Sequence, residues 1–157
     1  MKERSSASIA QDLRDAGVPP DAAMAISQAA RQFIRDRHLE AFEVSPAVQK
    51  ALFLRTDAAL KKDVQRLSDK PEVVQAYGAC ALDNTDPAIV DILVDLRFRG
   101  DYTGSSRAFV QRPAARKDLP AFTLVMKDAA NWTKVPKDRF QRRHAFLALA
   151  STARRKV

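Results

Sequence analysis

The chain has 157 residues, a length typical of one domain that buries a hydrophobic core. Hydrophobic residues make up 46% and charged residues 29%, as is ordinary for a globular protein, and a single cysteine excludes an internal disulfide. Lysine and arginine exceed the acidic residues by eight, and the isoelectric point near 10.0 favours a polyanionic partner such as nucleic acid, anionic lipid or an acidic cell-wall polymer.

Apolar spacing and helix-breaking residues predict a series of helices in the first half of the chain. A short helix over 8–16 is closed by Gly17, and a longer one opens at Asp21 after two prolines and runs to about Arg37. Ser45 and Pro46 form a cap followed by proline at the first helical position, which predicts a helix to about Ser68 with a bend near 53–56.

The second half continues in the same way, and its clearest helix starts at the Asp86-Pro87 cap. Ile89, Ile92, Leu93 and Leu96 follow it at the spacing of a buried helix face, and Gly100 is placed to end that helix. No pair of alternating runs joined by a tight turn predicts a hairpin. We therefore expect an all-α single domain of seven or eight helices without a substantial sheet. The other helices expected here are 71–77, 105–112, 119–130 and 136–153, the last with Phe140, Leu147 and Ala148 inward.

The cysteine and histidines predict no chemistry of their own. Cys80 lies among apolar neighbours and is expected to be a buried, inert thiol. His38 and His144 are far apart and give no metal-ligand spacing, so we expect no metal and no cofactor.

Asp95 and Asp101 are the candidates for a catalytic carboxylate pair, since two carboxylates that flank a cleft can cleave a glycosidic bond. The favoured alternative is structural. Asp95 would pair with Arg99 one helical turn later, and Asp101 would cap the next corner, where Tyr102 folds back over the helix end. No glycine-rich phosphate loop, nucleophile elbow or zinc signature is present.

The last predicted helix is rich in basic residues. Arg139, Arg142 and Arg143 lie on it, with Lys134 and Trp132 just before it. A basic helix beside an aromatic side chain suits nucleic-acid phosphate or an anionic glycan. A solvated face with a basic tail explains the same residues equally well.

The order of these features resembles the carboxy-terminal helical lobe of phage-type lysozymes, in the form of pesticin-like muramidases and type VI secretion lysozyme effectors. VSPAVQKALFLRTDAALKKDVQRL resembles the long helix that links the two lobes, and DPAIVDILVDLRFRG the central buried helix. DLRFRGDYT is the more specific part, and NWTKVPKDRFQRR is similar to the entry into a late helix. The resemblance covers about two-thirds of the chain. It divides the domain 1–157 into a helical insertion-like segment, 1–43, and a lysozyme-like lobe, 44–157.

The resemblance implies a peptidoglycan hydrolase whose catalytic lobe is missing from this sequence. The glutamate, aspartate and threonine of the family's active site have no counterpart here, so whether the chain is an enzyme stays open and we expect no activity from it alone. It would form part of a longer cell-wall-degrading effector or endolysin, completed by the missing lobe or by a partner protein. The resemblance and the basic helix together suggest a substrate-binding edge, with Phe98 packed inward, made of Arg97, Arg99, Tyr102, Trp132, Arg139 and Arg142.

A second hypothesis requires no missing lobe. In it, the chain is a non-enzymatic basic module that binds peptidoglycan, another anionic polymer or a protein partner. A small DNA-associated protein is the third reading and is less well supported. The start, MKERSSASIAQDL, lacks the apolar segment of a signal peptide, and no later run is long enough to span a membrane. We therefore expect a protein that is cytoplasmic as synthesised and that would reach the cell wall through secretion or phage lysis machinery.

Overall fold

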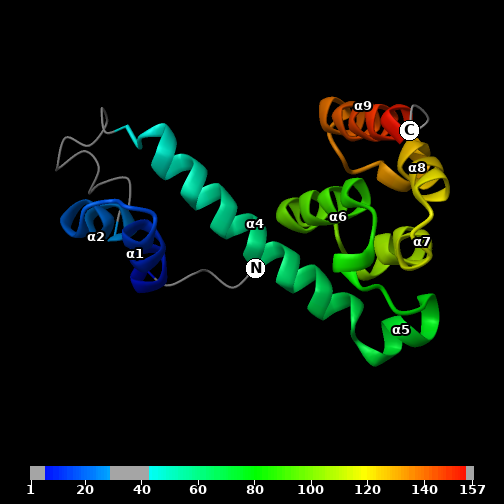
Figure 1. The fold of residues 1–157 in the computed structure, drawn as a ribbon, viewed down its shortest axis with the longest axis horizontal. Helices are drawn as coiled ribbons and strands as arrows, with labels where there is room; N and C mark the ends of the chain where they lie inside the picture. Colours follow the sequence, from blue (N-terminus) through cyan, green and yellow to red (C-terminus); the bar gives the residue numbers. More distant parts are fainter. Residues whose placement is uncertain (1–5, 29–42, 155–157) are drawn as a thin grey trace. The chain divides into compact units, whose positions relative to one another are not determined.

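The computed structural model describes residues 6–28 and 43–154, and within these ranges the chain is all-α, as the sequence predicts (Figure 1). The described residues form eight α-helices and two short 3-10 helices, and none of them lies in a strand. The α-helices are α1 (Ser6–Asp15), α2 (Pro20–Gln28), α4 (Pro46–Ser68), α5 (Pro71–Tyr77), α6 (Pro87–Arg99), α7 (Gly104–Ala115), α8 (Leu119–Lys127) and α9 (Lys137–Arg154), and the 3-10 helices are η2 (Leu82–Asn84) and η3 (Ala129–Trp132).

The chain divides into two compact units, Met1–Ala58 and Ala59–Val157, and the boundary falls within α4. The sequence predicted a single domain with a junction after residue 43. This boundary is not tested by the division into two units, and it stays a prediction. The second half of the helix expected over 21–37 lies outside the described residues.

The first unit is built on α1 and α2, which pack against each other. Its small core is closed by one face of the first half of α4. Arg55 of that helix forms ion pairs with Asp12 at 3.0 Å and Asp15 at 2.6 Å, and its hydrogen bond holds the pKa of Asp15 below the usual value. The core residues of this unit are Leu13, Val18 and Ala23, with Ala22, Ile26, Val48 and Leu52 packed around them.

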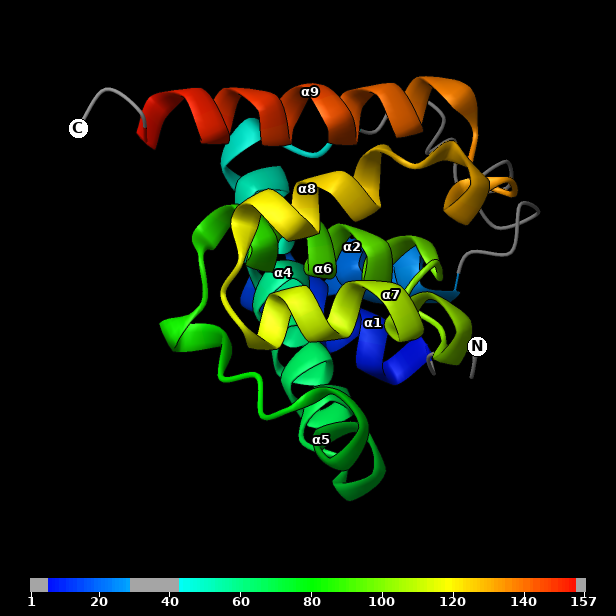
Figure 2. The same ribbon diagram turned by 90° about the vertical axis from the view of Figure 1, so that its right-hand side faces the viewer.

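The second unit is organised around α6, a helix that is buried on most of its surface. Asp86 caps its start by accepting a hydrogen bond from the Ala88 amide at 2.8 Å, and Gly100 ends it with φ 80°. Helices α8 and α9 pack against α6 and against each other, and α7 packs against α8. In Figure 2, α9 crosses one side of the unit, with α8 beneath it and α6 and α7 beneath α8.

Two details of the predicted helices are wrong. The helix expected over 119–130 ends at Lys127, because the carboxylate of Asp128 accepts from the Ala130 amide at 3.0 Å and starts η3 instead. The expected bend in α4 does not interrupt the helix, which runs unbroken from Pro46 to Ser68.

The inward faces of α6 and α9 also differ from those expected. In α9 the inward spacing is filled by Phe140, Arg143 and Leu147, whereas Ala148 is exposed. At the end of α6, Phe98 is 58% exposed instead of packed.

Cys80 is buried in the second unit, as expected, with 2% of its surface exposed. Burial raises the pKa of its thiol above the usual 9.0. The unfolded chain therefore releases this proton first as pH rises, so the stabilisation linked to the protonated thiol is complete below pH 9.0 and is lost above it.

We expect the free energy of unfolding, measured by urea titration, to fall more steeply above pH 9.0 in the natural chain than in Cys80→Ala. In the folded chain, labelling by a thiol reagent should be limited by opening of the structure. Labelling at the rate of a free cysteine would contradict this burial.

Candidate functional site

A groove lies at the corner where α6 ends, α7 begins and η3 leads towards α9; we call it the corner groove. Its volume is about 440 Å³. Two segments that are far apart in the sequence form it, Gly100–Phe109 on one side and Asn131–Val135 on the other. Its polar lining includes Thr103, Ser105, Asn131 and Lys134.

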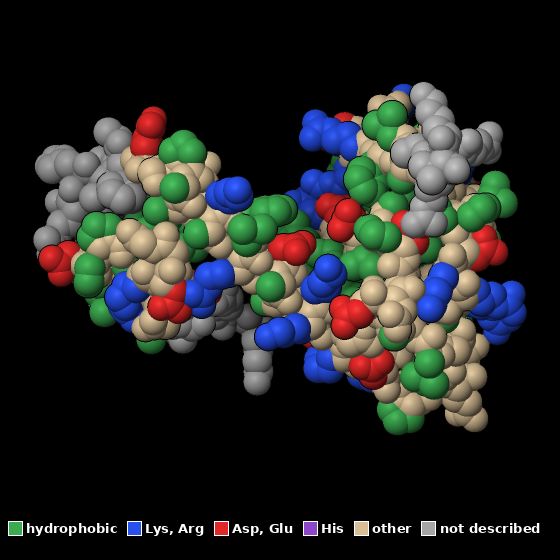
Figure 3. All heavy atoms as spheres, in the orientation of Figure 1, with side chains coloured by type: hydrophobic (Ala, Val, Ile, Leu, Met, Phe, Trp, Pro, Cys, Tyr) green, Lys and Arg blue, Asp and Glu red, His purple; other side chains and the backbone are tan. Residues whose placement is uncertain are grey.

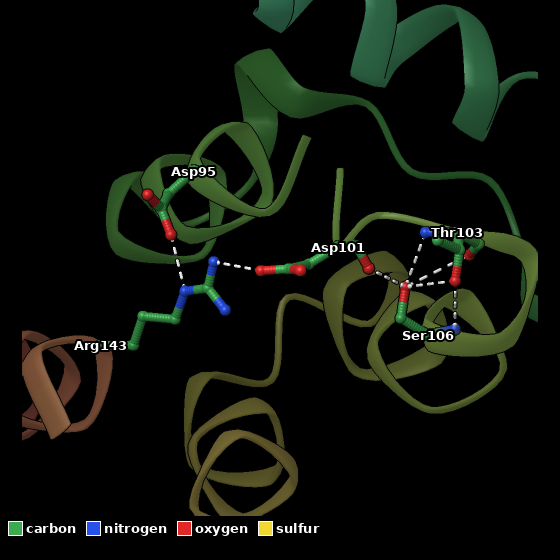
Figure 4. A network of polar contacts seen from close by, with 5 residues as sticks. All are labelled: Asp95, Asp101, Thr103, Ser106 and Arg143. Carbon is green, nitrogen blue, oxygen red and sulfur yellow. Dashed lines mark hydrogen bonds and ion pairs between the residues drawn. The ribbon is translucent and has the colours of Figure 1, made fainter. Parts of the chain in front are cut away.

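The first wall of the corner groove is fixed by a reciprocal helix cap. The Ser106 amide donates to Thr103 Oγ1 at 3.2 Å, and the Thr103 amide donates to Ser106 Oγ at 2.8 Å. Ser106 Oγ also donates to the backbone oxygen of Asp101 at 2.6 Å (Figure 4). The Ser106 hydroxyl is thus used structurally, whereas Ser105 beside it is exposed.

Aromatic side chains form the base of the corner groove. Phe109 meets Trp132 edge to face, with ring centroids 5.3 Å apart and an interplanar angle of 89°. Trp132 is only 4% exposed, and its indole N–H donates to the backbone oxygen of Val125 at 3.3 Å. Trp132, predicted as a ligand contact, therefore lines the groove from below and leaves a small part of its surface for a ligand.

Arg143 of α9 forms ion pairs with both candidate catalytic carboxylates. Its Nε donates to Asp95 at 2.6 Å and its Nη2 to Asp101 at 2.8 Å, and its side chain is 4% exposed. In Figure 4 the guanidinium lies between the two carboxylates, which come from α6 and from the loop after it. The same guanidinium lies 5.9 Å from the centre of the Trp132 ring.

The structural roles that the sequence suggested for Asp95 and Asp101 are wrong in their partners. Asp95 pairs with Arg143 and not with Arg99, and Thr103 rather than Asp101 caps α7. Each carboxylate accepts a hydrogen bond from the same buried guanidinium, and such charge-assisted hydrogen bonds are strong. The arrangement therefore suits an ion cluster that joins α9 to the corner, and a catalytic role of the two aspartates stays a prediction.

Two of the residues expected to contact a ligand, Arg97 and Tyr102, form hydrogen bonds within the protein instead. Arg97 donates to Asp63 of α4. Burial by itself raises the pKa of Asp63, but hydrogen bonds from Arg66 and Arg97 outweigh it and hold that pKa below its usual value. Tyr102 is 3% exposed, and its hydroxyl lies 3.2 Å from Ser68 Oγ.

The other expected ligand contacts lie on the surface. Arg99 is exposed at the end of α6, Arg139 is half-buried on α9, and Arg142 is 84% exposed with a loose 3.8 Å contact to Asp138. The six predicted residues therefore do not form a single edge, and Trp132 is the one among them that lines the corner groove.

Sequence reasoning named Arg143 as a basic residue of the last helix but missed its burial between Asp95 and Asp101, and it missed the lining residues Phe109 and Asn131. A signal for Arg143 existed, because it stands three residues after Phe140 and four before Leu147, at the spacing of an inward face. For Phe109 and Asn131 no signal existed, since their proximity depends on how α7 and η3 pack.

The net positive charge belongs to the second unit. Residues 1–58 contain eight basic and eight acidic side chains, whereas residues 59–157 contain nineteen basic and eleven acidic ones. Figure 3 shows Lys and Arg side chains at several places over this unit, with hydrophobic side chains between them. The corner groove thus lies in the part of the chain that attracts polyanions.

The described ranges contain neither a metal-binding cluster nor a helix that could span a membrane. Residues 6–28 and 43–154 contain no group of three or more His, Cys, Asp or Glu side chains placed to hold a metal ion. None of the helices in these ranges combines the length and the apolar character needed to cross a membrane.

Comparison with known proteins places the chain in a family whose function has not been described. No curated protein and no solved structure matches the chain. One family model matches residues 1–144, which include the whole first unit, the corner groove and Arg143. The chain therefore belongs to the family described as a domain of unknown function, DUF8812.

Proposed function

We propose that the second unit binds peptidoglycan as the helical half of a muramidase-like protein, and that residues 59–157 do not hydrolyse it by themselves. The observation that carries the proposal is the corner groove, where hydroxyl, amide and ammonium groups stand over an aromatic base. Pockets of this kind, apolar below with a few polar groups at the rim, are typical of binding sites for small polar ligands.

The chemistry of the groove matches that of a glycan strand with peptide stems. Thr103 and Ser105 offer hydroxyls to sugar hydroxyl groups, and Asn131 offers an amide to an N-acetyl group. Lys134 is exposed and makes no ion pair with a described residue, so its ammonium group is available to a stem carboxylate. The long α4, the buried α6 and the late helix α9 follow the order implied by the lysozyme resemblance, which supports the same substrate class.

We expect no hydrolysis because Asp95 and Asp101, the two candidate catalytic carboxylates, both bind Arg143. Both carboxylates accept hydrogen bonds from the buried guanidinium of Arg143, so they are engaged in joining α9 to the corner. A cleavage reaction at this groove would need its general acid from a different segment or a partner. Peptidoglycan lies outside the cytoplasmic membrane, so the function also requires delivery by a secretion or phage lysis system.

We expect the chain to sediment with purified peptidoglycan and to remain bound in about 0.5 M salt, because contacts inside a groove are screened less than surface charge. Ser105→Trp fills the groove and Lys134→Ala removes its cation, and each should weaken binding about tenfold, the loss of one well-made charged or packed contact. Lys62→Ala removes an equally exposed cation from α4 and is the matched control.

Turbidity measured in the same samples separates binding from hydrolysis. The natural chain, Asp95→Asn and Asp101→Asn should all leave the suspension turbid. Clearing that disappears in one of these variants would assign catalysis to the acidic pair and refute the non-catalytic proposal. Binding that is lost at high salt equally in all variants would refute recognition by the groove.

The excess charge of residues 59–157 favours a second candidate, a module for another anionic polymer such as nucleic acid. Such binding falls steeply with salt and depends on the number of cations rather than on the groove. In the sedimentation experiment, Lys62→Ala and Lys134→Ala would then have equal effects and Ser105→Trp would have none.

A further inference from the structure

A second groove separates α8 from α9, and we call it the α8–α9 groove. Its volume is about 630 Å³. Leu124 of α8 is 69% exposed beside it, and Ala148 of α9 is exposed within it. None of its lining residues belongs to the corner groove.

The apolar surface continues along α9. Ala145, Ala148 and Leu149 are exposed and follow the spacing of one helix face, and Leu149 is 73% exposed. Isolated exposed leucines are common on soluble proteins, but a continuous apolar face next to a groove marks an interaction surface.

Two lysines stand at the rim of the α8–α9 groove. Lys117 and Lys127 are exposed, and neither forms an ion pair with a described residue. The nearest acids in the sequence are used elsewhere, since Asp118 accepts from the Ala121 amide at 2.9 Å and Asp128 caps η3. The groove therefore carries two ammonium groups that have no ion-pair partner among the described residues, beside the apolar side chains of Leu119 and Leu124.

Lys117 also adopts a backbone conformation that lysine disfavours. Its φ is 56°, the only positive value at a non-glycine residue among the described residues, and it occupies the position after α7 where glycine is preferred. A residue with a Cβ atom is strained at such a position, whereas glycine adopts it freely. The charge of Lys117 is thus placed at the rim in spite of this local cost.

Thr123 adds a polar group without a partner to the α8–α9 groove. It is 8% exposed and lines the groove, and its hydroxyl has no hydrogen-bond partner among the described residues.

We propose that the α8–α9 groove binds a short acidic amphipathic helix of a partner protein. The occupant's leucine-type side chains would contact Leu124 and Ala148, and its carboxylates would pair with the two rim lysines. The nine residues of α8 span about 13 Å, which matches two to three turns of a bound helix.

The positive charge of residues 59–157 favours an acidic partner over a second copy of this chain as the occupant of the groove. Residues 59–157 have eight more basic than acidic side chains, so two copies that met through this rim would bring like charges together. An acidic helix gains from the same field during its approach and pairs with the lysines once it is bound.

The test uses the full chain and a fluorescein-labelled designed peptide of about 14 residues, with leucines on one helical face and glutamates on the other. Fluorescence anisotropy should show saturable binding with a Kd of tens of micromolar, typical of one small helix in a groove. A scrambled peptide of the same composition should bind at least about tenfold more weakly, because it has no apolar face.

Variants of the chain locate the contact. Leu124→Ser should weaken peptide binding about tenfold, and Lys117→Gln with Lys127→Gln should weaken it similarly and reduce its dependence on salt. Phe98→Ser removes a large apolar side chain and Lys62→Gln removes a cation at exposed positions outside the groove, and both should leave the affinity unchanged.

Three outcomes would overturn the proposal. The first is the lack of saturable binding up to about 1 mM peptide, which corresponds to less than about 4 kcal/mol of binding free energy. The second is equal binding of the scrambled peptide, which would mean attraction by bulk charge. The third is Leu124-dependent binding to vesicles of anionic phospholipid in preference to the peptide, which would assign the groove to a membrane surface.

Discussion

We expect Arg143→Ala to lower the free energy of unfolding by about 3 kcal/mol, the low end of the range for breaking a buried ion pair. Its guanidinium is buried and holds Asp95 and Asp101, which lie partly in solvent and so retain some hydration after the change. The truncation also removes the cation packed against Trp132. The measurement is urea unfolding followed by tryptophan fluorescence and circular dichroism.

Arg142→Ala is the matched control, because it removes the same side chain one residue earlier on α9 where it is 84% exposed. Its effect should stay within about 0.5 kcal/mol, as for most surface substitutions. Adding Asp95→Asn and Asp101→Asn to Arg143→Ala should recover part of the lost stability, since neutral amides then replace the two carboxylates that Arg143→Ala leaves without their cation. Equal losses for Arg143→Ala and Arg142→Ala would contradict the ion cluster.

Arg143→Ala should affect peptidoglycan binding as well as stability. Arg143 reaches from α9 to the loop that forms one wall of the corner groove. Its loss should therefore also weaken peptidoglycan binding by the molecules that remain folded. Binding variants of the groove, in contrast, should leave unfolding almost unchanged, because Ser105 and Lys134 are exposed.

Tyr102→Phe should lower the free energy of unfolding by about 2 kcal/mol, because it removes a buried hydroxyl and leaves polar partners unsatisfied. That hydroxyl donates to Gln111 Oε1 and lies 3.2 Å from Ser68 Oγ, so it joins α4, the corner loop and α7. Tyr77→Phe is the control. It removes a hydroxyl from a half-buried tyrosine that has no hydrogen bond to another described residue, and should change stability little.

The pH dependence gives a second measure of the same hydroxyl. Burial raises the pKa of Tyr102 above the usual 10.0, so the unfolded chain releases the proton first. The associated stabilisation is complete below pH 10.0 and is lost above it in the natural chain, whereas Tyr102→Phe lacks this part of the decline. Weaker peptidoglycan binding by Tyr102→Phe without any loss of stability would instead identify Tyr102 as a ligand contact.

The sequence alone determined the helices whose signals are local. The start of α6 follows from the Asp86 cap and Pro87, and its end from Gly100, which adopts the left-handed conformation that glycine favours. The all-α class follows in the same way from apolar spacing and from the absence of strand and hairpin patterns. These features depend on interactions within a few residues, which a linear sequence displays.

Only the tertiary structure decided which charged groups are buried and which segments meet. Arg143 was one of the basic residues expected on the surface of the last helix, either solvated or facing a polyanion, and its burial depends on Asp95, 48 residues earlier, and on Asp101. Arg97 points to Asp63 while Phe98 is exposed, since α4 supplies the acid. Both grooves likewise lie between helices that pack through contacts distant in sequence, and no local pattern encodes such contacts.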